Sequence, residues 1–351
     1  MNTPPSHSSA ADLRKRINGA LRSFFDAEAG SARHAFGRRI MRSIKEYTLR
    51  PGAKRTRGTL VVLGFLSNPR NRATADILKV AAAYEVLHAY LLIHDDIIDE
   101  DVVRRGRPTL HKVFESYAPR GLAKADREKV GRDIAIIAGD IASDLVQRCV
   151  LSTGFSLAQK MSALEDIERT LHTTYIGQVL DILALPEKVP PIDQQFLRYQ
   201  HKTAVYTIES PFLLGVRLGR ARIPTKAFHA FARDAGIAFQ LTDDVQNVFS
   251  RGLAGRSSDI RSGKITLLIS FALQSKRHSA TLLRLLRKRK KSGRDLVRLK
   301  ALIVESGGYE RARRYITNSF RRASILLDNL DIPDPVQKEF KRLVHKLAKQ
   351  V

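Results

Sequence analysis

The sequence predicts an all-α protein built as a single large helical bundle, and two observations carry this prediction. Apolar residues recur at spacings of three and four over several long stretches, as in helices with one buried face. Between these stretches the sequence has no β-hairpin signal and no alternation of strands with helices. With 351 residues, 43% of them hydrophobic, the chain can bury a large core.

Four long helices are expected from this periodicity. The first should continue to about Gly106 and Pro108, where glycine and proline end the pattern. The third should be kinked at Pro211, which lacks the backbone donor of a regular helical turn. Proline also marks the start of the fourth helix and the end of the second. The apolar periodicity that predicts these helices covers residues 75–99, 164–185, 196–219 and 225–249.

The composition limits the class of protein. Cys149 is the only cysteine, so an internal disulfide is impossible and a reducing compartment is expected. The first residues are polar, which disfavours a secretory signal. The most apolar run, residues 80–93, is too short and too polar to span a bilayer. We therefore expect a cytoplasmic protein with a flexible tail over residues 1–12 and one domain over residues 13–351.

The chain is strongly basic, with 61 Lys and Arg against 35 Asp and Glu and a formal net charge of +26. Nucleic acid, anionic substrates and anionic lipid are the partners that such a charge could attract. The densest basic run, residues 284–300, has no interleaved aromatic residue and no nucleic-acid motif. A solvated basic face is the favoured interpretation, with no nucleic-acid partner and at most a weak association with a membrane surface.

Acidic residues gather at the ends of two apolar helices. Asp95 and Asp99 are four residues apart and share a helix face, where they repel unless a cation lies between them. Such a pair suits Mg²⁺, which binds one or two carboxylates and completes its shell with water and phosphate. A solvated helix end explains the first cluster about equally well. Asp243 and Asp244 repeat the pattern and favour a metal site.

Basic residues lie near these acidic clusters in the sequence. Carboxylates, a metal and several cations together indicate a polyanionic ligand, most simply a diphosphate. Each basic segment alone is weak, because such segments are more often solvated turns. The segments are Lys54, Arg55 and Arg57 in PGAKRTRG, Arg104 and Arg105 in RRG, and Arg256 and Lys264 in GRSSDIRSGK.

These motifs, taken in order, resemble the trans-isoprenyl diphosphate synthases of the polyprenyl synthetase family. PGAKRTRG is similar to the family's GGKRxRP segment, and LLIHDDIIDEDVVRRGRPTLH to its first aspartate-rich motif, DDxxD, with the RRGxP that follows. GQVLD at 177–181, KTA at 202–204, FQLTDD at 239–244 and GRSSDIRSGK at 255–264 are also in place. The resemblance runs from about residue 51 to residue 264 and implies the isoprenoid synthase type of bundle, with a central cavity.

The resemblance also implies roles for individual residues. Mg²⁺ would be held by Asp95, Asp99 and Asp243, with Asp96 and Asp244 as auxiliary groups. The allylic diphosphate would be bound by Arg104, Lys202 and Lys264, with Thr203 and Gln240 near the developing cation. Isopentenyl diphosphate would be bound by Lys54, Arg57, His88 and Arg105. His88 lies on an apolar face and could be a core histidine, but the family match favours a ligand-binding role.

Some positions depart from the family pattern. The second motif reads DDVQN, so Asn247 stands in the place of a third Asp, and a weaker Mg²⁺ requirement could result. Gly58 replaces the usual Pro, Ala53 a Gly and Arg256 a Lys. A terpene cyclase is disfavoured, because its second motif would require a metal ligand where this chain has Arg251. A non-catalytic helical subunit would have no need for the complete Asp, Arg and Lys set.

Product length should depend on residues about one turn before Asp95. Tyr90 lies five residues and Leu91 four residues before this aspartate, with no insertion in the motif. The resemblance implies a short-chain product, geranylgeranyl diphosphate first and farnesyl diphosphate next. Tyr84, further from Asp95, could also be the residue that stops growth. A homodimer is expected because family members commonly form one.

Overall fold

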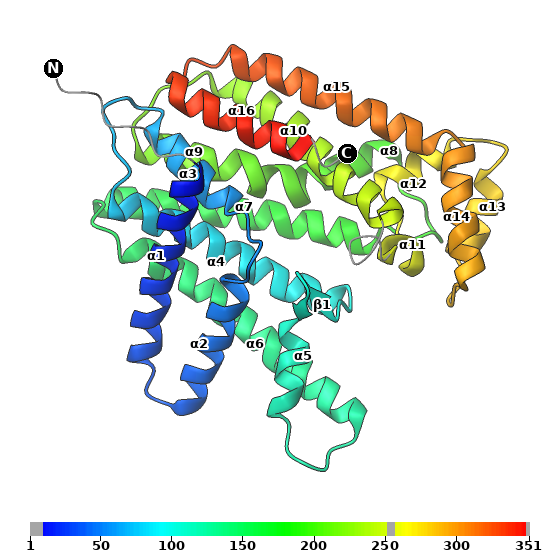
Figure 1. Ribbon diagram of the computed structural model, residues 1–351, viewed down its shortest axis with the longest axis horizontal. Helices are drawn as coiled ribbons and strands as arrows, with labels where there is room; N and C mark the ends of the chain where they lie inside the picture. The colour runs from blue at the N-terminus through cyan, green and yellow to red at the C-terminus, as the bar shows by residue number, and fades with distance from the viewer. Residues whose placement is uncertain (1–9, 251–256, 349–351) are drawn as a thin grey trace. The chain divides into compact units, whose positions relative to one another are not determined.

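The computed structural model describes residues 10–250 and 257–348. Contacts divide the chain into two compact units: unit 1 holds residues 1–165 and 211–221, and unit 2 holds residues 166–210 and 222–351. Helices make up every long element, which confirms the all-α prediction (Figure 1). Helix α1 begins at Ala10, so residues 10–12 of the predicted tail are helical, and the rest of that tail lies outside the described residues. The single domain predicted for residues 13–351 stays a prediction.

Helix α4 is the core helix of unit 1, where it packs against α1, α3 and α6. Its first half is buried nearly all round, which explains why its apolar run is so continuous. By length and composition this helix could cross a membrane, but 67% of the relevant window is buried inside the protein, as in a core helix. The helices of unit 1 are α1 (Ala10–Ser31), α2 (Ala35–Thr48), α3 (Thr56–Leu66), α4 (Ala75–Ile98), α5 (Leu110–Phe114), the 3₁₀ helix η1 (Glu115–Tyr117), α6 (Lys124–Leu151) and most of α9 (Ser210–Leu218).

A small β-hairpin follows α4 in unit 1. The helix ends at Ile98, and Glu100 at φ 53° takes the left-handed conformation that often terminates helices. Strands β1 (Val103–Arg104) and β2 (Arg107–Pro108) then pair antiparallel across Arg105 and Gly106, both at positive φ, as in a two-residue type I′ turn. The predictions of a helix reaching Gly106 and of no hairpin were wrong, because Gly106 serves the turn and not a helix end.

Helix α10 is the central helix of unit 2 and packs against α15 and η2. It covers the predicted range, residues 225–249, with Pro224 just before it. The helices of unit 2 are the larger part of α7 (Leu157–Ile182), α8 (Ile192–Tyr199), the π-helix η2 (Gln200–Glu209), α10 (Thr225–Phe249), α11 (Ser258–Ser262), α12 (Leu267–Leu273), α13 (Ser279–Leu286), α14 (Gly293–Glu305), α15 (Gly308–Asp328) and α16 (Asp334–Ala348).

The predicted third helix is divided into α8, η2 and α9. Its irregular part is the π-helix η2, which ends two residues before Pro211. Because proline has no N–H for the usual bond to the residue four before it, regular α-helical bonding is interrupted here. Within unit 2, η2 approaches α7 closely at Gly177, where a Cβ atom would lie 2.3 Å from the backbone nitrogen of Lys202. Only glycine allows this approach, which brings η2 against the GQVLD segment.

Candidate functional site

The predicted site residues form two groups, one in each unit, and each group is described by itself. The unit 1 cluster contains Lys54, Arg57, His88, Tyr90, Leu91, Asp95, Asp96, Asp99, Arg104 and Arg105. The unit 2 cluster contains Lys202, Thr203, Gln240, Asp243, Asp244 and Lys264.

Asp96 is the buried anchor of the first aspartate motif. The residue is 1% exposed, and the hydroxyl of Tyr47 donates to its Oδ2 at 2.6 Å. Its Oδ1 accepts a hydrogen bond from Nε of Arg104. Burial raises the pKa of Asp96 to about 6, although Arg104 and the Tyr47 hydroxyl favour the charged form. Both oxygens are therefore engaged within the protein, which agrees with an auxiliary role and not with direct metal binding.

Asp95 and Asp99 differ from Asp96 in their access to solvent. The side chain of Asp95 is 21% exposed, and Asp99, the C-cap of α4, is exposed. Among the described residues, no group of three or more acidic, His or Cys side chains could hold a metal ion by itself. Two carboxylates one helical turn apart still fit Mg²⁺, which takes few protein ligands and completes its shell with phosphate oxygens.

Arg104 is held among three carboxylates of unit 1. In addition to Asp96, its Nη2 lies 3.0 Å from Oδ2 of Asp101 and 3.9 Å from Oδ2 of Asp95. Burial alone would lower the pKa of Arg104, but the carboxylate of Asp96 raises this pKa above its ordinary value. Asp101, which follows directly after the first aspartate motif, thus pairs with Arg104.

Arg50, which the sequence reasoning missed, fixes the hairpin that carries these cations. Its Nη1 donates to the backbone oxygen of Arg104 at 3.2 Å, and its Nη2 donates to the backbone oxygen of Pro108. The guanidinium lies 4.3 Å from the ring centroid of Tyr47. One stacked pair thus supports both the hairpin and the buried Asp96.

His88 lies in a strongly cationic part of unit 1. Burial lowers its pKa well below the ordinary value of 6.5, and the charges of Arg57, Arg105, Arg104 and Arg55 lower it further. The imidazole is therefore neutral near pH 7. A neutral donor among guanidinium groups suits a bound anion, so the structure gathers three of the four predicted isopentenyl diphosphate ligands in one electrostatic environment.

Two arginines of this region adopt left-handed backbone conformations, Arg55 at φ 55° and Arg105 at φ 53°. Such angles are costly for residues other than glycine and often occur at functional sites. Arg55 is buried and is paired at 3.2 Å with Glu85, whose other oxygen accepts from the N–H of Gly58 at 2.9 Å. A proline at position 58 could not donate this bond, which gives the family departure at Gly58 a structural role.

In unit 2, Asp181 of the GQVLD segment gathers the predicted diphosphate ligands. Its Oδ2 pairs with Nζ of Lys264 at 2.7 Å and with Nζ of Lys202, and its Oδ1 lies 3.5 Å from Nη1 of Arg198. Although burial would raise it, Lys202 and Lys264 hold the pKa of Asp181 well below its usual range. Three cations around one carboxylate leave a net positive charge, as an anion site requires.

A hydrogen-bonded chain in unit 2 ends at Asp244. Thr203 donates to Oε1 of Gln240 at 2.7 Å, and Nε2 of Gln240 donates to Oδ1 of Asp244 at 3.0 Å. The hydroxyl of Tyr199 donates to Oδ2 of the same aspartate and accepts from the N–H of Leu267 at 2.8 Å. Burial raises the pKa of Asp244. Thr203 and Gln240 thus contact each other, and Asp244 is an anchor like Asp96.

Asn247 connects α10 to α11. Its Nδ2 donates to the Ser258 hydroxyl at 2.7 Å, and its Oδ1 accepts from the N–H of Asp259 at 3.2 Å. An aspartate has no amide group for the first bond, so the DDVQN variant serves a structural contact. Arg251, at the position where a terpene cyclase would need a metal ligand, and Arg256, in the GRSSDIRSGK segment, lie outside the described residues.

Tyr90 and Leu91 lie on different faces of α4. The ring of Tyr90 makes an edge contact with His94 at 5.1 Å between centroids, and Nε2 of His94 lies 3.6 Å from Oδ1 of Asp140 on α6. Leu91 is four residues before Asp95 and three after His88, spacings that share one helix face. Leu91 is therefore the better aligned of the two with the predicted ligands.

Besides Arg50, four residues that contact the predicted site residues or their motifs were missed from the sequence: Tyr47, Glu85, Asp181 and Tyr199. Asp181 belongs to a segment that had been recognised, and a buried acidic residue there could have been expected to pair with lysines. The two tyrosines gave no usable signal, since a phenol finds its partner only through helix packing.

Comparison with known proteins identifies the family of the chain. The family described as Polyprenyl synthetase matches residues 38–303. A geranylgeranyl pyrophosphate synthase of Arabidopsis thaliana is 31% identical over 252 residues, 68% of this chain and 64% of that relative. A geranylfarnesyl diphosphate synthase of Aeropyrum pernix is 29% identical over 312 residues, 85% of this chain and 90% of that relative.

A solved structure has the same fold. The geranylgeranyl pyrophosphate synthase of Corynebacterium glutamicum has a TM-score of 0.87 and 28% identity, covering 97% of this chain and 99% of that protein. The matched family region includes both clusters, with the two aspartate motifs and the cations around them. The chain belongs to the polyprenyl synthetase family.

Proposed function

We propose that the chain is a Mg²⁺-dependent prenyltransferase that condenses isopentenyl diphosphate with allylic diphosphates to a short all-trans prenyl diphosphate. The observation that carries this proposal is the meeting of Lys202 and Lys264 at Asp181, which forms a cationic site in unit 2. The cationic surroundings of neutral His88 in unit 1 support it. So do the relatives, which are named as prenyl diphosphate synthases, and the Corynebacterium enzyme, which was solved with isoprenyl diphosphate and magnesium.

In this proposal Asp95, Asp99 and Asp243 would hold Mg²⁺, which would supply positive charge to the allylic diphosphate. Arg104, Lys202 and Lys264 bind the same diphosphate, and their charges stabilise it as the leaving group. The allylic C–O bond then breaks, and its electron pair leaves with the diphosphate. The alkene of isopentenyl diphosphate supplies the electron pair of the new C–C bond, and the proton lost next is accepted by the released diphosphate.

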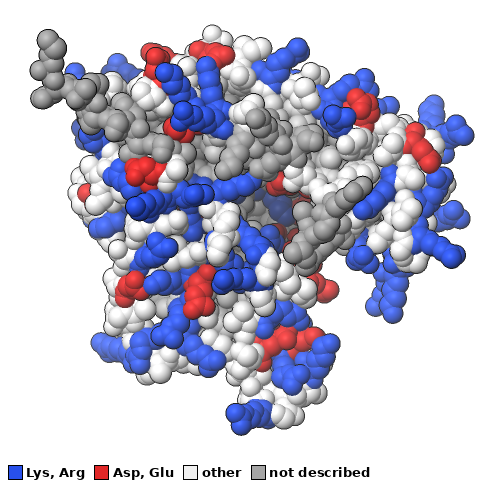
Figure 2. All heavy atoms as spheres, viewed as in Figure 1, with Lys and Arg blue, Asp and Glu red and all other residues white. Residues whose placement is uncertain are grey.

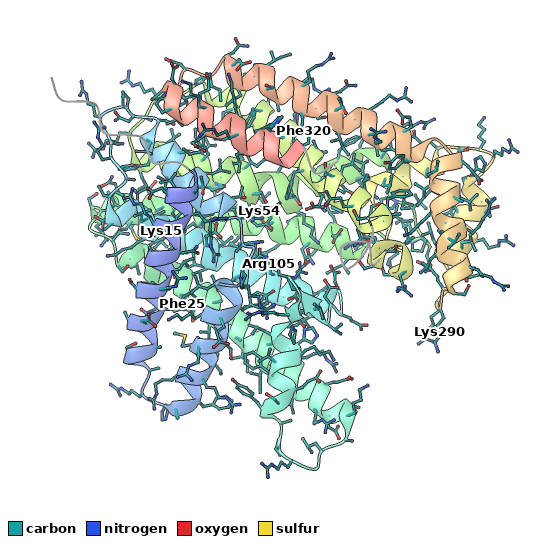
Figure 3. All side chains as sticks on the ribbon, in the orientation of Figure 1. Lys15, Phe25, Lys54, Arg105, Lys290 and Phe320 are labelled. Atoms are coloured by element: carbon teal, nitrogen blue, oxygen red, sulfur yellow. The ribbon has the colours of Figure 1, made fainter. Side chains whose placement is uncertain are left out.

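The residues of unit 1 bind the second substrate in this proposal. Lys54 and Arg105, which Figure 3 labels, offer charged donors to the diphosphate of isopentenyl diphosphate, as does Arg57. His88 offers a neutral donor. Thr203 and Gln240 present their dipoles to the developing allylic cation. No side-chain nucleophile takes part in these steps. The cytoplasmic location expected from the sequence remains a prediction.

Geranylgeranyl diphosphate is the proposed main product, with farnesyl diphosphate as the alternative. The Arabidopsis relative is named for the geranylgeranyl product, and the Aeropyrum relative for the geranylfarnesyl product, which is one isoprene unit longer. The test incubates the purified chain with isopentenyl diphosphate and with dimethylallyl, geranyl or farnesyl diphosphate, with and without Mg²⁺. We expect extension of each primer to the geranylgeranyl product only when Mg²⁺ is present. Failure to condense any primer would refute the proposal.

The two competing functions would give different results in the same assay. A terpene cyclase would release hydrocarbon and diphosphate from a prenyl diphosphate without consuming isopentenyl diphosphate. A non-catalytic subunit would bind diphosphates without turnover. Asn247 is engaged by its contacts with α11, which disfavours a cyclase-type metal ligand at that position. The cationic clusters disfavour a non-catalytic subunit with a degenerate site.

A homodimer is also part of the proposal. Helix α7 exposes Ile176, Val179 and Ile182 at 44%, 50% and 47%, and their spacing of three residues places them on one apolar face. Light scattering coupled to size exclusion tests this surface with Val179→Glu. Val304→Glu is the matched control, since Val304 on α14 is 51% exposed. We expect only Val179→Glu to be monomeric, and a monomeric wild type would contradict the proposal.

A further inference from the structure

Helices α13 and α14 of unit 2, with residues 287–292 between them, form a surface that the proposed catalytic function does not use. Residues 276–300 contain eleven Lys and Arg and a single acid, Asp295. Figure 1 shows the two helices side by side, with their connecting loop directed away from α12 and α15. Figure 3 places Lys290 at the tip of this loop, and Figure 2 shows the surrounding surface densely covered by Lys and Arg. We call α13, α14 and this loop the basic arm.

Internal pairing neutralises little of this charge. Nζ of Lys288 lies 2.6 Å from Oδ1 of Asp295 on the same arm, and Nη1 of Arg298 lies 2.9 Å from Oε1 of Glu305. Lys291 donates to the backbone oxygen of Arg261 at 3.0 Å. Several further cations of the arm are exposed and have no acidic group within ion-pair distance among the described residues: Arg284, Arg289, Lys290 and Arg294. The arm therefore presents a strong, uncompensated positive field.

The arm is a packed structure and not a loose chain. Its buried face consists of Leu282, Leu285, Leu286, Leu296, Leu299, Leu302 and Ile303. Helix α14 begins with a reciprocal capping box, in which Ser292 and Asp295 each bond the other's backbone N–H. Because the backbone is fixed, the exposed cations can meet a surface together with a small loss of conformational entropy.

The outward face of α14 also carries apolar groups. Val297 is 70% exposed and Val304 is 51% exposed, and they stand among Arg294 and Arg298 at helical spacings. Cations alternating with exposed aliphatic side chains are typical of helices that lie on the headgroup region of a bilayer. The sequence of residues 276–300 contains no Phe, Tyr or Trp on which a nucleic-acid base could stack.

We infer that the basic arm docks the protein onto an anionic phospholipid surface. The inference extends the weak membrane association expected from the sequence by naming the site and the lipid charge. It stands or falls independently of prenyl transfer, because no residue of the arm belongs to either cluster. Basic side chains next to an anionic leaflet each strengthen binding by roughly five-fold at moderate salt, an effect that salt screens.

The test is sedimentation of the full chain with vesicles of phosphatidylcholine alone or with phosphatidylglycerol added. The variant Arg289→Glu/Lys290→Glu reverses two unpaired cations of the loop. The matched control, Arg321→Glu/Lys338→Glu, makes the same change of net charge at exposed positions on α15 and α16. Circular dichroism and turnover with dimethylallyl diphosphate confirm that both variants are folded.

We expect the wild type to bind only the anionic vesicles, and to be released by high salt. The loop variant should bind at least about twenty-five-fold more weakly, and the control variant should lose much less. Equal losses in the two variants would show that net charge alone is responsible and would overturn the inference. The inference would also be overturned if the wild type does not bind anionic vesicles, including the case in which it binds duplex DNA or RNA instead. Loss of turnover with vesicle binding intact would contradict the proposed function only.

Discussion

The hydroxyl of Tyr47 on α2 donates a 2.6 Å hydrogen bond to the buried Asp96 of the first aspartate motif. Unit 2 repeats this relationship, since the hydroxyl of Tyr199 on α8 donates to the buried Asp244 of the second motif. In both motifs the second aspartate is an anchor inside the protein, and the first aspartate keeps access to solvent. The two aspartates of each pair therefore have different roles. The second one anchors its helix inside the protein, and the first remains available to a metal ion.

Replacement of Tyr47 by Phe should lower both stability and rate. The change removes a hydrogen bond to a buried carboxylate and leaves one oxygen without its donor, a loss of about 2 kcal/mol in the free energy of unfolding. Because Asp96 also holds Arg104, turnover should fall about ten-fold or more. Urea unfolding and steady-state kinetics measure the two effects.

Tyr117→Phe is the control for this substitution, since the Tyr117 hydroxyl only meets Ser43, at 3.2 Å. That variant should match the wild type in both measurements. Unchanged stability and unchanged turnover in Tyr47→Phe would contradict the anchoring role of the tyrosine.

Asp181→Asn should destabilise unit 2 in a way that diphosphate reverses. The amide keeps the shape of the side chain but leaves Lys202, Lys264 and Arg198 without their common counter-charge. Breaking such buried pairs typically costs about 3 kcal/mol. Inorganic diphosphate can replace the lost charge, so it should raise the melting temperature of this variant more than that of the wild type.

Differential scanning fluorimetry with and without diphosphate measures the effect of Asp181→Asn. Asp193→Asn, at an exposed position at the start of α8, removes one carboxylate without exposing a cationic cluster. It should melt like the wild type at every diphosphate concentration. Equal diphosphate shifts in all three proteins would refute Asp181 as the residue that gathers the cations.

Regular helices and cation-rich motifs could be predicted from the sequence because their signals are local. Helix α10 fits its predicted range, since its apolar face recurs at every turn. The network of Asp181 was missed because its ion pairs join segments that only the packing of α7, η2 and the chain after α11 brings together. The hairpin was missed for a different reason: Arg105 adopts a left-handed conformation that side-chain identity does not favour.

The pH dependence of stability should reveal the buried His88. Its pKa in the folded protein lies below the unfolded value of 6.5, so the stability it contributes is present above that value and is lost as the pH falls. Between pH 7.5 and 5.5, the wild type should therefore lose more free energy of unfolding than His88→Gln, which cannot be protonated.

Urea unfolding at the two pH values provides the measurement for His88. His345→Gln, at an exposed position on α16, is the control and should follow the wild type. If wild type and His88→Gln lose stability in parallel, the imidazole does not have a lowered pKa in the folded protein.

Product length should respond more to Leu91 than to Tyr90. Leu91 shares a helix face with His88 and Asp95, whereas the ring of Tyr90 packs on His94 on the side of α6. Leu91→Ala should extend farnesyl diphosphate beyond the wild-type product, and Leu91→Phe should give a product shorter than that of the wild type. Tyr90→Ala should lengthen the products less than Leu91→Ala does. Mass spectrometry of the products measures this, with Leu151→Ala at the exposed end of α6 as the control. A larger effect from Tyr90→Ala would show that the chain grows along the α6 side of α4, which would contradict the alignment argued for Leu91.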